Sequence, residues 1–406
     1  MLERLRERDS TSLLAVAGAA LAAVVAVPLV VSGPGNDLDV ANVFRSGRSI
    51  ARHLSYVPSR APGAPVHEAI VGVLDLIGGS LLTNLSSVAA AVALVLGLDR
   101  LLRREGVSGG GRWAVALVAA NPWFVIAATS TADYVFALAF VVGAALALRD
   151  GRPVLSGLLA AASMGCRIGS GTLVLALLVA ELTGRQSIDP IDESGTSTRG
   201  APRRGVLVAS IVGAVATVIL FIPAALSVGG LSFAENDFST SGPLVQLGRA
   251  VAKDITLLGP IATVVALFTV PAVWAAIRGW QTSWLVRFSV VGIVLSQGLF
   301  VRFPWKMAHL LPGLLCLAIL LAVALEHRPR LLVALVVLQL AFCLVRIDLI
   351  APDNPNAATG GRLRPGVGLG PVVIDWQCRR EHPDAYRGRQ KVEVEAAWDC
   401  AKPFGR

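Results

Sequence analysis

The chain has 406 residues, of which 54% are hydrophobic and 16% are charged, and its formal net charge is +9. A soluble domain has about 25% charged residues. Apolar runs of about 20 residues recur along the whole length, so the sequence excludes a soluble globular protein. No Walker-type loop and no G-x-G-x-x-G turn after a strand is present, so we expect no nucleotide cofactor.

The apolar segments predict an all-α polytopic membrane bundle with about eleven membrane helices. Each segment is long enough to cross a bilayer, except that 154–182 is predicted as two short helices broken at Cys166–Gly171. The other spans are expected at 12–32, 81–98, 113–129, 134–148, 205–228, 255–277 and 284–301, in a segment that follows residue 309, and at 331–347.

Basic residues near the N-terminus orient these spans. Arg4, Arg6 and Arg8 precede the first span, and basic loops are retained on the cytoplasmic side. We therefore expect a multi-pass plasma-membrane protein with a cytoplasmic N-terminus and an extracytoplasmic C-terminus. The same rule places the polar loop 184–204 inside and the loop 229–253 outside.

The polar segment Gly35–Glu68 follows the first span and is expected outside the membrane. Its Asp37 and Asp39 would face the same side of an extended chain. Such carboxylates serve as a general base or ligate a divalent cation, and the sequence leaves the cation requirement open. The alternative is that they cap a helix, since Asp is a preferred N-cap residue.

The apolar stretch Ala69–Gly78 is too short to cross the bilayer and contains Asp75. It predicts a helix that lies at the interface. The first external loop, with this helix, therefore extends over 33–79.

Two charged residues lie at later breaks between spans. Asp133 precedes the span 134–148 and is either a helix cap or a site residue. Arg167 lies between two short apolar helices. Insertion of such a charge costs roughly 2.5–3.5 kcal/mol, so it marks a candidate functional residue.

The turn RFPWKMAH gathers Arg302, Lys306 and His309 at the predicted outer surface. The cations either anchor the interface together with Trp305 or bind a phosphate group. Acids of the first loop and bases from three regions thus share one face, which suits an anionic lipid headgroup beside a catalytic carboxylate.

The five cysteines fall into two groups. Cys166, Cys316 and Cys343 lie in or near apolar spans and are expected to pack there. The remaining two lie in the polar tail and can form a Cys378–Cys400 disulfide if the tail faces an oxidising compartment. We divide the chain into a transmembrane catalytic domain, 1–348, and an extracytoplasmic tail, 349–406.

Several motifs, taken in order, resemble the GT-C superfamily of membrane glycosyltransferases, which includes protein O-mannosyltransferases and lipid A aminoarabinose transferases. The resemblance covers roughly residues 10–330. It rests on an acidic motif after the first span, a proline-rich segment before an amphipathic helix, an Asn-Pro span end before an acid, an arginine-broken short helix, and a basic turn. Here these read NDLD, PSRAPGAPVHEAI, NPWFVIAATSTAD, GLLAAASMGCRIGSG and WKMAHLLP.

The resemblance implies transfer of a sugar from a polyprenyl phosphate to a lipid, a cell-wall glycan or a protein. Asp39 or Asp37 would be the base. Arg167 and Lys306 would be phosphate ligands, and His67 or Glu68 would line the site. The other candidate site residues, taken from the charged segments themselves, are Arg60, Asp133, Arg302 and His309. The motifs depart from the family pattern in having D-x-D rather than D-E and in lacking a proline after Arg167.

Two alternatives remain on the sequence alone. A transporter or flippase of an anionic lipid or solute would have broken helices at matching positions in two halves. A noncatalytic membrane subunit would retain the acids as helix caps only.

Overall fold

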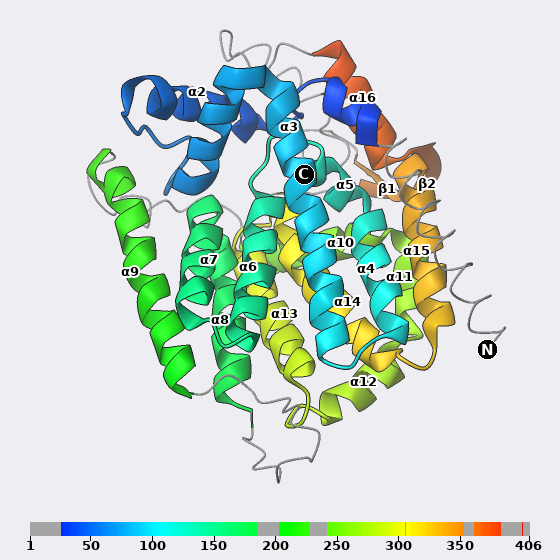
Figure 1. The fold of residues 1–406 in the computed structure, drawn as a ribbon. Helices are drawn as coiled ribbons and strands as arrows, with labels where there is room; N and C mark the ends of the chain where they lie inside the picture. Colours follow the sequence, from blue (N-terminus) through cyan, green and yellow to red (C-terminus); the bar gives the residue numbers. More distant parts are fainter. Residues whose placement is uncertain are drawn as a thin grey trace, which may run out of the picture.

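The structure is a computed structural model, and it describes residues 26–184, 203–227, 242–304, 306–352, 361–382 and 400. These residues form a helical bundle with one β-hairpin (Figure 1). The loop predicted at 184–204 and most of the first predicted span lie outside the described residues. Helical structure is described at 26–31, the end of that span.

Four helical segments are long and apolar enough to cross a membrane, and two bent pairs raise the number to six. Four shorter apolar helices accompany them. The chain is a multi-pass membrane protein. The four long segments are α3 (Pro65–Arg104), α9 (Arg203–Ser227), α13 (Trp284–Arg302) and the continuous stretch of η3 (Met307–Leu310) and α14 (Leu311–Ala324).

Two predicted straight spans are sharply bent. The segment predicted at 113–129 is α4 (Gly109–Ala120) followed by α5 (Pro122–Ala128), at 67°. In the second pair, α10 (Pro243–Leu258) meets α11 (Pro260–Leu267) at 92°. Each second helix begins with proline, which has no N–H for a preceding helix to use.

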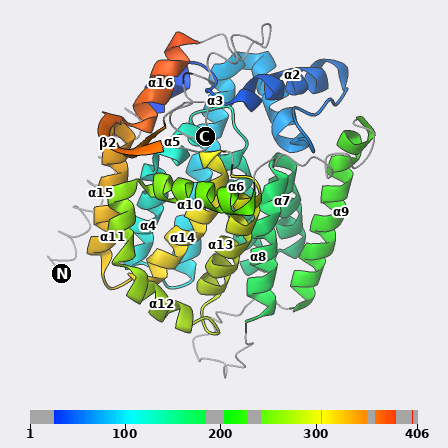
Figure 2. The ribbon, with the colours of Figure 1, turned by 180° about the vertical axis from the view of Figure 1, so that it is seen from behind.

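The bend at α10 also corrects the prediction of an external loop over 229–253, because α10 begins within it. Seen from behind, α10 runs across the bundle rather than along it (Figure 2). The chain then continues through α12 (Val270–Arg278) into α13.

The polar segment after the first span is more ordered than predicted. Leu38–His53 forms helix α2, whereas the sequence suggested an extended start. Asp39 in its first turn and Arg52 and His53 in its last turn suit the helix dipole. The short helix predicted at 69–78 is the first part of α3, which has non-helical backbone angles at Gly78 and Gly79.

Helix α2 crosses the first part of α3 with backbone against backbone. A Cβ atom on Gly47 would lie 2.7 Å from the Glu68 carbonyl oxygen and 2.7 Å from the Gly72 nitrogen. Arg48 Nε bonds Asp75 Oδ2 at 2.5 Å beside this crossing. Two glycines therefore let α2 lie flat on α3, which fixes the loop that carries the acidic motif.

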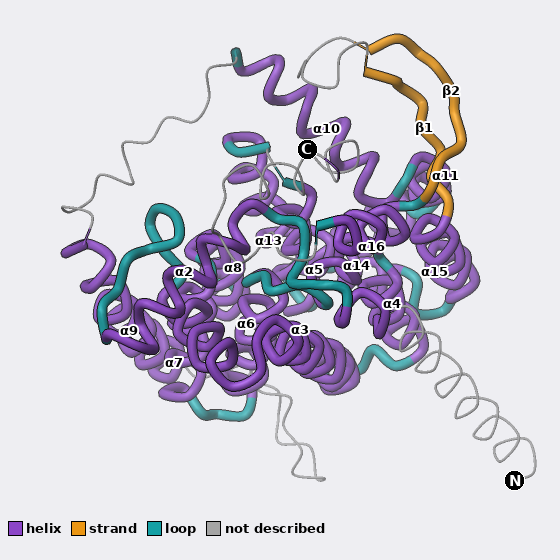
Figure 3. Tube along the Cα trace, turned by 90° about the horizontal axis from the view of Figure 1, so that it is seen from above, coloured by secondary structure: helices purple, strands orange, loops and turns teal. Residues whose placement is uncertain are grey.

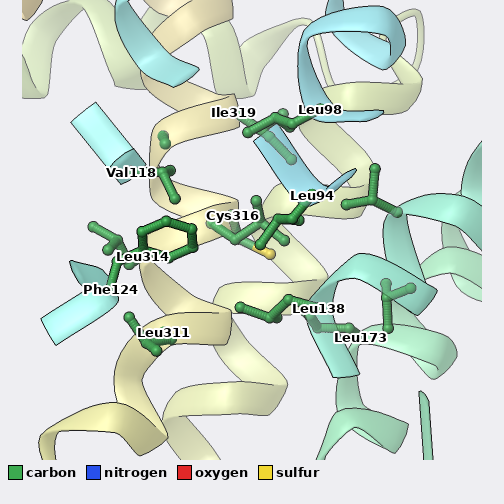
Figure 4. Close-up of a cluster of buried hydrophobic side chains, with 14 of the residues drawn as sticks. Leu94, Leu98, Val118, Phe124, Leu138, Leu173, Leu311, Leu314, Cys316 and Ile319 are labelled. Carbon is green, nitrogen blue, oxygen red and sulfur yellow. The ribbon is translucent and has the colours of Figure 1, made fainter. Parts of the chain in front are cut away.

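The hydrophobic core lies between α3, α4, α6 (Tyr134–Arg149), α8 (Gly171–Leu182), α13 and α14. Figure 4 shows hydrophobic side chains of α3, α4, α5, α6, α8 and α14 meeting around Cys316. Gly292 on α13 leaves room for that sulfur atom, because a Cβ atom there would overlap it. Cys166, Cys316 and Cys343 are buried free thiols.

The long segment 154–182 is broken as predicted. It consists of α7 (Pro153–Cys166), the short helix η1 (Ile168–Ser170) and α8. Arg167 lies in the break with extended backbone angles. At the opposite end of these helices, Arg149 lies 3.6 Å from Glu181.

The tail begins earlier than predicted. Helix α15 (Pro329–Leu344) ends before the predicted limit of 347, because the antiparallel strands β1 (Val345–Pro352) and β2 (Gly361–Leu369) follow directly. The domain boundary placed after residue 348 therefore falls within β1. Helix α16 (Pro371–Glu381) follows, and a disulfide joins Cys378 to Cys400.

In Figure 1, α2, the start of α3 and α16 lie at the upper end of the bundle, and Figure 3 looks down on that end. This end carries the acidic motif, so the site is built there.

Candidate active site

Acidic and basic side chains alternate in a continuous chain at this end of the bundle, which we call the ionic chain. Its order is Asp37, Lys306, Asp39, Arg60, Asp133 and Arg167. The six residues come from α2, its preceding loop, the proline-rich loop, the turn before α6, the break after α7 and the turn before η3. Sequence positions 130 residues and more apart thus meet in one place.

Lys306 joins the two acids of the first loop. Its Nζ atom lies 2.5 Å from Asp37 Oδ1 and 2.7 Å from Asp39 Oδ2. Asp37 also caps α2, because its Oδ1 atom accepts a hydrogen bond from the Asp39 backbone N–H at 2.9 Å. The capping alternative therefore describes Asp37, whereas Asp39 lies in the first helical turn and points its carboxylate at cations.

Arg60 connects the first loop to the turn before α6. Its Nη1 atom lies 3.1 Å from Asp39 Oδ2, and its Nη2 atom pairs with Asp133 Oδ2. Arg167 approaches the same carboxylate from the other side, with Nη1 3.0 Å from Asp133 Oδ1. Asp133 occupies the N-cap position of α6 but makes no side-chain capping bond there.

The neighbouring charges fix the protonation of these groups. Burial raises the pKa of Asp39, but Lys306 and Arg60 outweigh burial and hold that pKa below its ordinary value. Burial likewise raises the pKa of Asp133, and Arg60 and Arg167 lower it further than burial raises it. Asp39 and Asp133 are therefore ionised at neutral pH.

The acidic partners raise the pKa values of the cations. Burial lowers the pKa of Lys306, but Asp37 and Asp39 raise it above the ordinary lysine value. Burial also lowers the pKa of Arg60, and Asp133 and Asp39 more than reverse that effect. With three anions and three cations, the ionic chain has no net charge.

Polar side chains hold the first loop in place. Asn84 Nδ2 donates to the carbonyl oxygens of Val30 and Gly33 at 3.0 and 2.8 Å. Thr131 Oγ1 donates to Asn84 Oδ1 at 3.0 Å, and its backbone N–H donates to the Pro34 carbonyl at 2.8 Å. The loop carrying Asp37 is thus bonded to the turn carrying Asp133.

The Asn-Pro motif has a structural role. Asn121 Oδ1 accepts from the backbone N–H groups of Trp123 and Phe124 and so caps α5. Its Nδ2 atom donates to the Leu257 carbonyl at 2.8 Å and to Gln339 Oε1 at 2.9 Å. The fully buried amide therefore joins the two bent spans at their bends.

Glu68 and His67, both predicted to line the site, are fully buried beside it. Glu68 accepts from Ser46 Oγ at 2.9 Å, from Ser59 N at 3.1 Å and from Ser59 Oγ, so it fastens the proline-rich loop to α2 and α3. His67 lies edge-on to Phe136 at 5.2 Å, and neither ring nitrogen has a hydrogen-bond partner within the described part of the chain.

The three predicted site residues of the basic turn before α14 lie in different surroundings. Lys306 belongs to the ionic chain, and His309 packs near it against Tyr134, with ring centroids 6.0 Å apart. Arg302 is exposed, and its guanidinium lies over the adjacent Phe303 ring at 5.7 Å. The structure therefore does not bring Arg302 into the ionic chain.

The sequence analysis did not identify three residues that support the site, namely Tyr134, Ser46 and Ser59. The Arg167 guanidinium lies 4.0 Å from the Tyr134 ring centroid, an arrangement that orients a cation. Ser46 and Ser59 hold Glu68. Tyr134 could have been found from its position directly after Asp133. Ser46 and Ser59 could not, because a serine in a polar segment carries no signal that separates a buried donor from an exposed one.

No protein-family model and no curated protein sequence matches the chain. Solved structures do match. ArnT from Cupriavidus metallidurans bound to undecaprenyl phosphate shares 15% identity and a TM-score of 0.59, over 96% of this chain and 75% of ArnT. The apo ArnT structure shares 14% identity and a TM-score of 0.54, over 97% and 75%.

The chain has the fold of ArnT. This confirms the predicted fold class, an all-α polytopic membrane bundle. The ArnT likeness extends over nearly the whole described chain, so it includes the end of the bundle that holds the ionic chain.

The acidic motif is already occupied by a cation of the protein itself. The Lys306 ammonium lies at the contact distance of both Asp37 and Asp39, so a divalent cation bound to this pair would displace it. One group of three metal-ligand types occurs elsewhere among the described residues: Glu381, His382 and Cys400. Because Cys400 is in the disulfide, that group has no thiolate to offer.

Proposed function

We propose that the protein is an integral membrane glycosyltransferase of GT-C type. It would transfer a sugar from a polyprenyl phosphate to a lipid, a cell-wall glycan or a protein at the outer face of the plasma membrane. The observation that carries this proposal is the placement of Asp39 between Lys306 and Arg60 in an ArnT fold. The undecaprenyl phosphate bound to ArnT supports a carrier lipid of that class.

The ionic chain supplies both parts of a displacement at a sugar carbon. An acceptor hydroxyl or amine needs a base, and Asp39 is an ionised carboxylate. The departing polyprenyl phosphate needs cations, and Lys306, Arg60 and Arg167 supply them. The acceptor atom would bond to the anomeric carbon as the carbon–oxygen bond to phosphate breaks, with inversion, and Asp39 would take the acceptor proton.

Pairing makes Asp39 a weak base in the free protein. A general base works best when its pKa is near the working pH, and two cations hold the Asp39 pKa low. The phosphodiester group of the donor, placed between Lys306 and Arg60, would compete for both cations. Donor binding would therefore weaken their hold on Asp39 and raise its basicity only when a donor is present.

Asp37 and Asp133 would have supporting roles. Asp37 caps α2 and shares Lys306, and Asp133 orients the guanidinium groups of Arg60 and Arg167. The Asp39 carboxylate lies between Lys306 and Arg60, whereas the Asp133 carboxylate lies between Arg60 and Arg167. We therefore assign the base to Asp39.

The transporter alternative gains one feature from the structure, because broken spans occur in both halves of the chain. However, the α4–α5 and α10–α11 bends face each other and are bonded through Asn121. Gln339 Nε2 also donates to the Leu258 carbonyl at 2.6 Å. Protein side chains thus occupy the helix ends that a transporter would offer to its solute, which favours the transferase.

The test is transfer by purified protein in lipid nanodiscs, measured as release of polyprenyl phosphate from polyprenyl-phosphate sugars. The double variant Asp37→Asn, Asp39→Asn should abolish turnover. The control Asp99→Asn removes a carboxylate near the far end of α3, where it pairs with Arg103, and should leave turnover unchanged. Full turnover in the double variant would refute the assigned base, and an inactive wild type with every donor would favour the noncatalytic alternative.

A further inference from the structure

The tail helix α16 contacts two segments that lead into the ionic chain, one before Asp37 and Asp39 and one before Asp133. It does so through buried polar side chains. Arg379 is 1% exposed and Asp375 is 6% exposed, although both belong to the tail that is predicted to lie outside the transmembrane domain. They form an ion pair at 2.7 Å along the helix. A buried ion pair costs desolvation, so further hydrogen bonds are needed to stabilise it.

Arg379 supplies those bonds to two segments that lead into the site. Its Nη1 atom donates to the Leu29 carbonyl at 3.0 Å and to the Thr129 carbonyl at 2.6 Å. Leu29 lies shortly before the loop of Asp37 and Asp39, and Thr129 lies four residues before Asp133. One guanidinium group therefore sets the spacing between the segment that leads to Asp37 and Asp39 and the segment that leads to Asp133.

Asp375 extends this contact to the acidic motif itself. Asn36 Nδ2 donates to the Asp375 backbone oxygen at 2.9 Å and to Asp375 Oδ1 at 3.0 Å. Asn36 immediately precedes Asp37. The adjoining Gly35 has a φ of +111°, and a Cβ atom there would lie 2.6 Å from Ser130 Cβ, so the loop passes closely over the turn before Asp133.

We propose that Asn36, Asp375 and Arg379 are positioning residues that hold Asp39 at Lys306 and Arg60. We call them the tail clamp. The proposal rests on the proposed function for its kinetic consequence, but the clamp itself is a statement about loop geometry. Because Lys306 and Arg60 act on Asp39 over a few ångströms, a small displacement of the loop would change both reactivity and protonation.

The first test compares Asn36→Ala with the control Gln377→Ala, which changes an exposed position on α16, the helix that Asn36 contacts. Asn36→Ala should lower kcat/KM about ten- to a hundredfold, as a misplaced reacting group does. It should also move the acid limb of the kcat/KM profile to higher pH, because Asp39 loses part of its contact with the cations. A purely structural role would reduce the amount of folded protein and leave the acid limb in place.

The second test does not need enzymatic activity. Amide hydrogen exchange should become faster in residues 36–40 of Asn36→Ala, and in both 36–40 and 129–133 of Arg379→Lys, which keeps the charge but has a single donor group. Gln377→Ala should exchange as the wild type does. Wild-type exchange in both segments of the clamp variants, or faster exchange with an unmoved acid limb, would overturn the proposal.

The two tests separate the clamp from the proposed function. If the wild type transfers no sugar from any polyprenyl phosphate, the function fails while the exchange measurement still decides the clamp. If transfer is present and Asn36→Ala matches the wild type in kcat/KM, acid limb and exchange, the clamp fails and the transferase stands.

Discussion

At the residue scale, the carboxylates of Asp37 and Asp39 share the Lys306 ammonium but differ in their other partners. Asp39→Asn should lower kcat by about 10²–10⁴-fold, the usual contribution of a general base. Asp37→Asn should reduce kcat far less, because asparagine also caps helices well and the base remains. Steady-state rates of both single variants measure this difference, and equal losses would contradict the assignment of the base to Asp39.

The charge on Lys306 sets the pH dependence of the reaction. The pKa of Asp39 is lowered, so the wild-type acid limb of kcat/KM should lie below the ordinary value of about 3.9. Lys306→Met removes one cation, which should raise the pKa of Asp39 and move the acid limb to higher pH. Measured pH profiles check this shift, and a limb that stays in place would show that another group titrates.

Lowered pKa values also make the stability of the fold depend on pH. Asp39 and Asp133 have pKa values lowered in the folded protein, so their charges stabilise the fold above the unfolded pKa of about 3.9. That contribution should be lost as the pH falls through the lowered folded values. The melting temperature in detergent should therefore decrease as the pH is lowered below about 4. The decrease should be less steep in Asp133→Asn.

At the scale of elements, the contact between α2 and α3 depends on the absence of side chains at Gly47 and Gly72. Gly47→Ala places a Cβ atom against fixed backbone, so it should destabilise the protein by about 1–3 kcal/mol. Gly248→Ala on α10 meets nothing within 4 Å and should be neutral or slightly stabilising. Denaturation of both variants in one detergent decides between close packing and a general intolerance of alanine.

The sequence was informative about elements where hydropathy alone decides. The break at Arg167, the short helix before Gly78 and the separate α6 all followed from apolar length and from flanking charge. The bends at Asn121 and Gly259 were missed, because a buried hydrogen-bond network holds them and hydropathy does not detect it. Helix α2 was missed because Ser46 and Arg48 bond to Glu68 and Asp75 of α3, and the sequence does not reveal these partners.

The candidate site was predictable in its residue types but not in its pairing. Asp37, Asp39, Arg60, Asp133, Arg167 and Lys306 were all candidates, and the structure joins them in one chain. Which acid meets which base depends on loop paths fixed by Asn84, Thr131 and the tail clamp. Those contacts involve residues far apart in sequence, with no periodic signal.

At the scale of the whole molecule, the proposed orientation has a direct chemical test. An extracytoplasmic tail would be oxidised at Cys378 and Cys400, and the structure has three free cysteines within the bundle. Protein denatured without reductant should therefore react with maleimide at three cysteines, and at five after reduction. Five reactive cysteines before reduction would place the tail in a reducing compartment and reverse the topology.

The side chain of Asn121 has a consequence for the membrane as a solvent. Inside a bilayer no water is present to satisfy the ends of a broken helix, so a bend there requires an internal substitute. The Asn121 amide accepts from one helix start and donates to another helix end, as a bound water molecule would. The side chain thus satisfies backbone groups at both bends without water, so these bends would be tolerated even where lipid surrounds the bundle.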